Sequence, residues 1–156
     1  MAKRKKSLNK IPKLSPLLRS AFEVLEHGLW HFLRSETTTD MKFAILHVDQ
    51  CIELLLKERV RKGGESIYKG PKETISIWAA YSILEQKFNC IIPEKPDLEL
   101  IHEERNNIQH KYSNPNAEDS AFLIDCSMKF IKRFLNDELG LKIEDYIPLE
   151  YLEQVL

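Results

Sequence analysis

The residues best suited to chemistry are concentrated in the segment Arg105-Asn106-Asn107-Ile108-Gln109-His110-Lys111-Tyr112. An arginine is always charged, and its planar fork binds phosphate or carboxylate groups through two parallel hydrogen bonds. A histidine changes charge near neutral pH, so it can accept or donate a proton during a reaction. Arg105, Asn106 and His110 therefore form a candidate catalytic set that would bind an anion and transfer a proton.

Hydrophobic periodicity predicts that this segment is an amphipathic helix. At about 100° per residue, Arg105 falls in the same sector, about 80° wide, as four apolar residues: Leu98, Ile101, Ile108 and Tyr112. Asn106 and His110 lie four residues apart and share the flank of this stripe. A guanidinium on an inward face requires a carboxylate or a bound anion as its partner.

Two carboxylates in an earlier predicted helix are candidate supporting residues for Arg105. Asp49 falls within the apolar sector of that helix and Glu53 falls on its edge. Either carboxylate could pair with the guanidinium and hold it in place. The alternative is that both side chains are solvated at the mouth of a groove.

The pattern predicts an all-α fold, an antiparallel bundle of four to five helices. The helices are expected from Ser15-Pro16 to about Ser35, from a cap at Thr37-Thr38-Thr39-Asp40 to Gly63-Gly64, from about Glu73 to Phe88, from an Asp97 cap to before Ser113, and from about Ala117 to Leu139. The second is apolar on all sides and should be central. The fifth carries two apolar stripes, so one stripe needs a further cover, either a short helix within 148–156 or another subunit.

Composition excludes several classes of protein. The chain has 156 residues, of which 43% are hydrophobic and 30% charged, as expected for one globular domain with its own core. Only five glycines are present and no Gly-rich loop, which argues against P-loop and dinucleotide-binding folds. No apolar run reaches the roughly 18 residues that a membrane span needs. Cys51, Cys90 and Cys126 are expected to be buried free thiols of a cytoplasmic protein.

Charge is balanced overall but uneven at the start of the chain. The formal net charge is −1, which argues against a general polyanion binder. Residues 1–14 form a basic arm, followed by a single helical domain over 15–156. The basic residues of the arm are Lys3, Arg4, Lys5, Lys6, Lys10 and Lys13. Such an arm could attract RNA or DNA, or it could be a solubilising tail.

The first predicted helix contains a second polar pattern. Glu23, His27 and His31 are spaced four residues apart and could hold a metal ion on one helix face. No fourth ligand is evident, and Gly28 adds flexibility in the middle of the pattern. We therefore expect an exposed polar stripe here and no metal site.

The Arg-polar-x3-His pattern in a small all-α chain resembles the HEPN superfamily, whose signature is Arg-x4-6-His, commonly with Asn, Asp or His directly after the Arg. Arg105, Asn106 and His110 match this signature with a four-residue spacer. Tyr112 extends the match to Arg-x4-His-x-Tyr, the form seen in HEPN toxins that pair with a minimal nucleotidyltransferase. The similarity in helix order covers roughly residues 16–139.

The resemblance implies a metal-independent endoribonuclease that works in the cytoplasm without a cofactor, as a toxin or phage-defence effector. His110 would act as general base on the 2′-OH or as acid on the leaving 5′-oxygen, and Arg105 would brace the scissile phosphate. Asn106 would hydrogen-bond the imidazole or a phosphate oxygen. The expected products carry 2′,3′-cyclic phosphate and 5′-OH ends. The family joins two copies in a homodimer, so that one cleft holds two histidines and two arginines.

Tyr112 has two possible roles. Two functions other than that of a ribonuclease also remain open. A nucleotidyltransferase-like antitoxin partner would attach AMP to the Tyr112 hydroxyl and block the RNA cleft, or Tyr112 simply packs in the apolar sector. The chain could be a non-catalytic HEPN-like module that binds RNA, a nucleotide or a partner protein. It could also be a helical interaction subunit in which Arg105 only pairs with Asp49 or Glu53. No membrane partner is expected.

Overall fold

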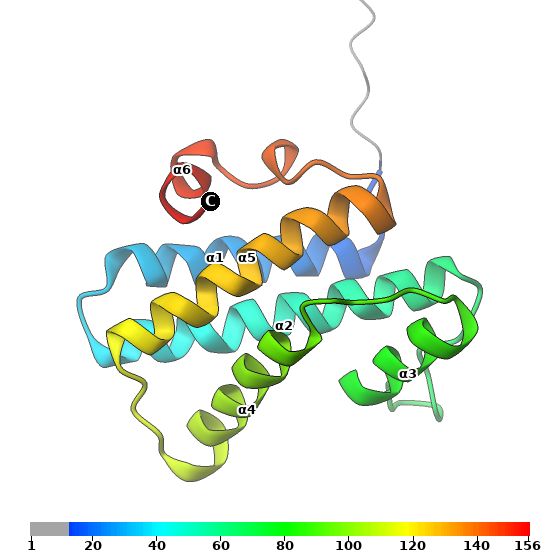
Figure 1. Cartoon of the computed structure of the whole chain (residues 1–156), viewed down its shortest axis with the longest axis horizontal. Helices are drawn as coiled ribbons and strands as arrows, with labels where there is room; N and C mark the ends of the chain where they lie inside the picture. The colour runs from blue at the N-terminus through cyan, green and yellow to red at the C-terminus, as the bar shows by residue number, and fades with distance from the viewer. Residues whose placement is uncertain (1–12) are drawn as a thin grey trace, which may run out of the picture.

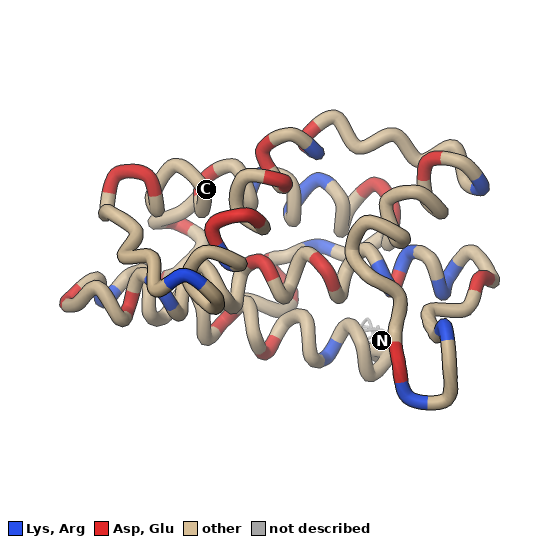
Figure 2. The backbone as a smooth tube through the Cα atoms, turned by 90° about the horizontal axis from the view of Figure 1, so that it is seen from below, with Lys and Arg blue, Asp and Glu red and all other residues tan. Residues whose placement is uncertain are grey.

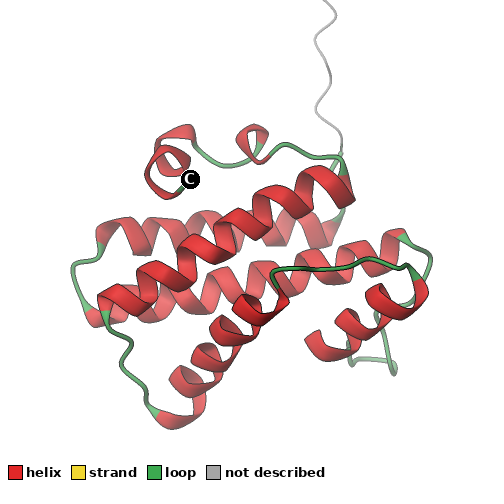
Figure 3. Cartoon of the chain, viewed as in Figure 1, coloured by secondary structure: helices red, strands yellow, loops and turns green. Residues whose placement is uncertain are grey.

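The computed structural model describes residues 13–156, and this part of the chain is almost entirely helical (Figure 1). Its elements are α1 (Pro16–Arg34), α2 (Thr38–Lys62), α3 (Ile77–Lys87), α4 (Lys95–Lys111), α5 (Ala117–Leu139), the 3₁₀ turn η1 (Ile143–Asp145) and α6 (Leu149–Val155). Within residues 13–156 there is no strand, and the one bridge pair is Tyr68 with Thr74 (Figure 3). The prediction of an all-α fold is confirmed for these residues, whereas the basic arm lies almost wholly outside them.

The helix ends follow local signals that the sequence contains. The Ser15 hydroxyl accepts a hydrogen bond from the Leu18 backbone N–H, and Pro16 occupies the first turn of α1. Thr37 and Asp40 form a reciprocal capping box at the start of α2. α5 ends at Gly140, whose φ of 65° is the left-handed conformation that glycine adopts without strain.

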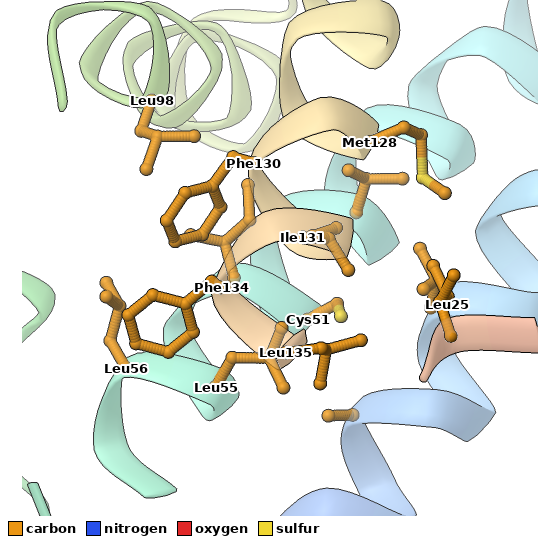
Figure 4. Close-up of a cluster of buried hydrophobic side chains, with 14 of the residues drawn as sticks. Leu25, Cys51, Leu55, Leu56, Leu98, Met128, Phe130, Ile131, Phe134 and Leu135 are labelled. Carbon is orange, nitrogen blue, oxygen red and sulfur yellow. The ribbon is translucent and has the colours of Figure 1, made fainter. Parts of the chain in front are cut away.

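Helix α2 is the centre of the fold, as predicted from the apolar residues on all of its sides. It contacts α1, α3, α4 and α5, and α1 lies alongside it in the opposite direction (Figure 1). Figure 4 shows where α5 packs across α2, with Phe134 of α5 beside Leu55 and Leu56 of α2 and Phe130 farther along α5, toward Leu98. Leu98 brings α4 into the same core. Burial of these large side chains is the main source of stability for the helices.

The starts of α3 and α4 differ from the prediction. α3 begins at Ile77, because Ser76 caps it through the Ala79 backbone N–H, while the preceding residues form the turn that pairs Tyr68 with Thr74. α4 begins at Lys95, so Asp97 lies inside its first turn and is not the cap. Trp78, in the first turn of α3, is 49% exposed.

The apolar stripes of α5 are both covered by the chain itself. Leu123, Phe130 and Phe134 are buried, and so are the opposite residues Ile124, Met128, Ile131 and Leu135. α6 packs on α1 and α5, as the cover within 148–156 was expected to do. The cover holds from Leu123 onward, whereas Ala121 and Phe122 near the start of α5 are exposed, Phe122 to 55%.

Charged and thiol groups are distributed as follows. Acidic and basic residues are interspersed along the described helices in Figure 2. No helix within residues 13–156 has both the length and the apolar character that a membrane crossing requires.

The three cysteines are free thiols, with Cys51 and Cys90 buried as predicted and Cys126 only half-buried.

Candidate functional site

Helix α4, which carries Arg105 and His110, is held in place by polar contacts at both ends. At its start, Glu94 accepts two hydrogen bonds from the Arg133 guanidinium of α5, one of them 2.7 Å long. At its other end, the Ser113 hydroxyl donates to the Glu104 carboxylate over 2.9 Å. Bidentate and charge-assisted bonds of this kind fix geometry more strongly than single neutral ones. The segment with the candidate catalytic residues is therefore a positioned helix.

Asp49 forms the polar connection between α2 and the middle of α4. Its side chain is 1% exposed, and its Oδ2 accepts a 2.9 Å hydrogen bond from Nδ1 of His102. The same oxygen lies 3.9 Å from Nε of Arg105. Oδ1 of Asp49 is buried and has no hydrogen-bond partner within residues 13–156. The alternative of a solvated Asp49 is therefore wrong, because the carboxylate lies inside the fold between two basic side chains.

The hydrogen bond to Asp49 raises the pKa of His102 above its usual value of 6.5. Burial and the nearby Arg105 act in the opposite direction, whereas the negative charges of Asp49 and Glu53 add to the increase. Sequence reasoning missed His102. His102 lies three residues before Arg105, on the inward side of the same helix. This spacing places the two side chains next to each other and could have pointed to His102.

Arg105 is partly buried, with 31% of its side chain exposed. Its Nη1 donates a 3.0 Å hydrogen bond to Oδ1 of Asn106, so Asn106 contacts the guanidinium and not the His110 imidazole. Glu53, the second predicted partner, instead accepts a 2.8 Å bond from Lys57 on its own helix. Asp49 is thus the carboxylate beside Arg105.

Arg105 lines a groove of about 450 Å³ between α2 and α4, which we call the α2–α4 groove. Its polar lining also includes His47, Gln50, Glu53, Lys57 and Gln109, and Phe43, Leu46 and Leu54 supply the apolar part. Lys57 is buried and paired with Glu53, so Arg105 is the partly exposed cation of this lining. The concave surface is large enough for a nucleotide-sized group.

His110 and Tyr112 lie outside this groove. His110 is exposed in the last turn of α4, and five residues of helix turn it by about 140° relative to Arg105. Tyr112 is the residue that ends α4, with a φ of 56° and a side chain that is 90% exposed. The interpretation that Tyr112 packs in the apolar sector is wrong, because the helix ends before it and the chain turns away.

A second polar cluster lies between α1 and α2. His27 and His31 of α1 meet His47 of α2, with ring centroids 4.7 Å apart for the His27–His47 pair. The expected exposed stripe is wrong for His31, which is largely buried and bonded to Asp40 over 2.9 Å. Glu23 is exposed and is not part of the group. Sequence reasoning missed His47, because it lies on a different helix.

The surroundings of this cluster shift two pKa values. Burial lowers the pKa of His47, and the charges of His27 and His31 lower it further, so the neutral imidazole is favoured. The hydrogen bond from His31 lowers the pKa of Asp40. His47 borders both this cluster and the α2–α4 groove.

Comparison with known proteins gives no match for this chain. No family model, no curated protein and no solved structure matches it.

Proposed function

We propose that this protein is a metal-independent endoribonuclease of the HEPN type, with Arg105 and His110 as its catalytic residues and Asn106 as a supporting residue. RNA carries its own nucleophile, the 2′-OH next to each phosphate. The protein must therefore supply proton transfer and stabilisation of the charge that develops on the phosphate. An arginine and an accessible histidine on one fixed helix match these two needs.

The observation that carries the proposal is the environment of Arg105. Its guanidinium is held from the protein side by the buried Asp49 and laterally by Asn106, while 31% of the side chain remains accessible. A donor group fixed before the substrate arrives stabilises a developing charge without the cost of reorganisation. Lys57 also lines the groove that Arg105 borders, but its ammonium is buried and paired with Glu53, so the charge offered to a phosphate there comes from Arg105.

His110 is the residue proposed to transfer the proton. It is exposed, whereas the other histidine of α4, His102, is only 8% exposed and is bonded to Asp49. We assign His102 a positioning role, because a buried imidazole cannot reach a ribose hydroxyl. Cleavage by transesterification needs both a base and an acid, and one exposed His110 supplies one of them.

A two-fold homodimer is the second part of the proposal. Arg105 and His110 diverge by about 140° around α4, so a second α4 facing the first would place the histidine of one protomer near the arginine of the other. Such a composite cleft would contain two of each residue, and thus both an acid and a base. The copies would meet through α4, because Arg105 and His110 both belong to this helix.

Tyr112 suits the proposed regulation by an antitoxin. Its phenol is 90% exposed two residues after His110, so a nucleotidyltransferase-like partner could reach the hydroxyl without unfolding the helix. AMP attached at this position would add bulk and negative charge beside the proposed cleft, which would repel RNA.

A second candidate function is a non-catalytic module that binds RNA, a nucleotide or a partner protein. The observation that favours it is that the Arg105 guanidinium already has polar neighbours in the fold. It donates a hydrogen bond to Asn106 and lies near Asp49. In that case the guanidinium would bind phosphate without any proton transfer by His110.

The test compares cleavage of single-stranded RNA by wild type, Arg105→Ala and His110→Ala, each purified identically and incubated in EDTA. We expect a loss of about 10²–10⁴-fold for His110→Ala and about 10²–10³-fold for Arg105→Ala. Arg19→Ala, an exposed arginine of α1, is the matched control and should cleave as wild type does. Equal cleavage by all variants would indicate a contaminant and contradict the proposal. RNA binding without cleavage by wild type would favour the second candidate.

A further inference from the structure

The three histidines between α1 and α2 form a group with the composition of a metal site. One ligand atom each from His27, His31 and His47 lies within 4.8 Å of the other two. Neutral imidazoles are common ligands of Zn²⁺ and other late first-row divalent ions. Two nitrogens bound to one tetrahedral Zn²⁺ lie about 3.4 Å apart. Small side-chain rotations would therefore bring the three nitrogens to metal-binding distance.

The His31–Asp40 pair has the form of an orienting contact behind a metal ligand. Oδ1 of Asp40 accepts a 2.9 Å hydrogen bond from Nδ1 of His31. With Nδ1 bonded to the carboxylate, Nε2 is the nitrogen of His31 that remains for a metal ion. Metal-bound histidines almost always make such a bond to a carboxylate or carbonyl through their second nitrogen. Asp40 is itself held by the capping box at the start of α2, so the imidazole orientation is set by the backbone.

His47 supplies a second, independent indication of a ligand. Its Nδ1 is buried and has no hydrogen-bond partner within the described residues. Buried polar atoms normally have a partner, because an unpaired one costs free energy. The protein around His47 does not supply this partner. A cation bound by the three histidines would give the His47 imidazole a partner.

The packing of α1 on α2 brings the histidines together. Gly28 lies next to His27, and a Cβ at this position would come within 2.9 Å of the His47 Cβ and 3.4 Å of the Ala44 carbonyl oxygen. The absence of a side chain at Gly28 thus allows the two helices to approach closely at the cluster. Gly28, which the sequence pattern suggested would weaken a metal site, is the residue that permits the approach of His47.

From these observations we infer that His27, His31 and His47 bind one divalent transition-metal ion, Zn²⁺ in the first instance. His27 is exposed, so the ion would be reachable from solvent. No fourth His, Cys, Asp or Glu within residues 13–156 joins the group, which leaves one coordination position for water or another ligand. The aromatic rings of Trp30 and Phe43 flank the cluster, with centroids 4.9 and 5.0 Å from that of His31.

This inference is independent of the proposed ribonuclease activity. The cluster lies at α1 and α2, whereas the proposed catalytic residues are on α4. His47 also lines the α2–α4 groove, so a bound ion would add positive charge beside that groove. Loss of RNA cleavage would not affect the metal assignment, because the test below measures metal binding directly.

The test is calorimetric titration of Zn²⁺ into the full chain, prepared without a histidine tag and stripped of metal with a chelator. We expect one Zn²⁺ per chain, and tetrahedral-type visible absorption when Co²⁺ is used as the probe. Asp40→Asn should weaken Zn²⁺ binding by about 10–100-fold, as removal of an orienting partner does. His27→Gln, His31→Gln and His47→Gln should each weaken it further.

Glu23→Gln is the matched control, because Glu23 lies on the same helix four residues before His27 but outside the cluster. Its Zn²⁺ affinity should equal that of wild type. His27 is exposed, so His27→Gln should retain the fold even if His47→Gln disturbs the α1–α2 packing, and circular dichroism checks both. Absence of saturable Zn²⁺ binding in wild type, or equal affinity in His27→Gln and wild type, would overturn the inference.

Discussion

Asp49 and His102 are joined by a 2.9 Å hydrogen bond between Oδ2 and Nδ1, across 53 residues of sequence. Asp49 belongs to the central helix α2, and His102 lies one turn before Arg105 on α4. The bond therefore links the core of the fold to the helix that carries the proposed catalytic residues. It also places a carboxylate beside Arg105, whose Nε is 3.9 Å from the same oxygen.

Removal of this carboxylate should destabilise the protein. Asp49→Ala leaves His102 buried without its partner and Arg105 without a nearby negative charge. We expect the free energy of unfolding to fall by about 1.5–3 kcal/mol, the range for a hydrogen bond to a charged group. Urea denaturation measures the change. Asp125→Ala, at a half-exposed position on α5, is the control and should barely move the midpoint. Equal effects of the two substitutions would contradict the structural role of Asp49.

The raised pKa of His102 predicts a pH dependence of stability. The bond to Asp49 favours the protonated imidazole in the folded state, so protonation of His102 stabilises the folded protein. This contribution is fully present below the unfolded value of about 6.5 and is lost as pH rises through the higher folded pKa. The free energy of unfolding of wild type should therefore exceed that of His102→Gln by more at weakly acidic pH than at alkaline pH.

Two measurements check this dependence. Urea unfolding of wild type and His102→Gln across the pH range gives the stability difference, and the comparison cancels contributions from the other histidines. Proton NMR of the His102 ring gives its pKa directly. A folded pKa at or below 6.5, or a difference that grows with pH, would contradict the assignment.

Gly28 should tolerate alanine poorly, although alanine favours a helix. The new Cβ would approach the His47 Cβ to 2.9 Å. Overpacking of this kind costs about 1–3 kcal/mol, which offsets or exceeds the gain of about 1 kcal/mol in helix propensity. Gly70→Ala is the control, because no atom lies within 4 Å of a Cβ built there. Thermal unfolding of both variants measures the difference. A Gly28→Ala variant more stable than wild type would show that α1 and α2 have room to separate.

Tyr112 should be replaceable without loss of fold. Its φ of 56° is a conformation that glycine adopts without strain. Tyr112→Gly is therefore expected to raise the free energy of unfolding by about 0.5–1 kcal/mol. Tyr112→Phe should be neutral, because the side chain is exposed. Clear destabilisation by Tyr112→Gly would indicate that the aromatic ring packs against the domain.

The sequence predicted those parts of the fold that local signals determine. The bounds of α1, α2 and α5 follow from caps such as Ser15 and Gly140, which act within one turn. The start of α3 was misplaced, because the pairing of Tyr68 with Thr74 is a contact between segments. Tyr112 was placed on a helical wheel that no longer applies once the helix has ended.

The candidate site was predictable only in part for the same reason. Arg105 and the carboxylate of Asp49 were identified from their inward positions on two helices, which periodicity reveals. His102 and His47 were missed, because their significance comes from partners on other helices. The sequence does not give the rotation of one helix about another, and that rotation decides which histidine faces Asp49 and which joins His27 and His31.

The most direct test of the proposed function is the identity of the RNA ends that wild type produces in EDTA. A defined oligonucleotide and its copies, each with a single 2′-deoxy substitution, are incubated with the purified protein, and the products are analysed by mass spectrometry. The proposal predicts 2′,3′-cyclic phosphate and 5′-OH ends, and no cleavage at a deoxy-substituted position, because the 2′-OH is the nucleophile. Products with 5′-phosphate ends, or cleavage next to a 2′-deoxy residue, would contradict it.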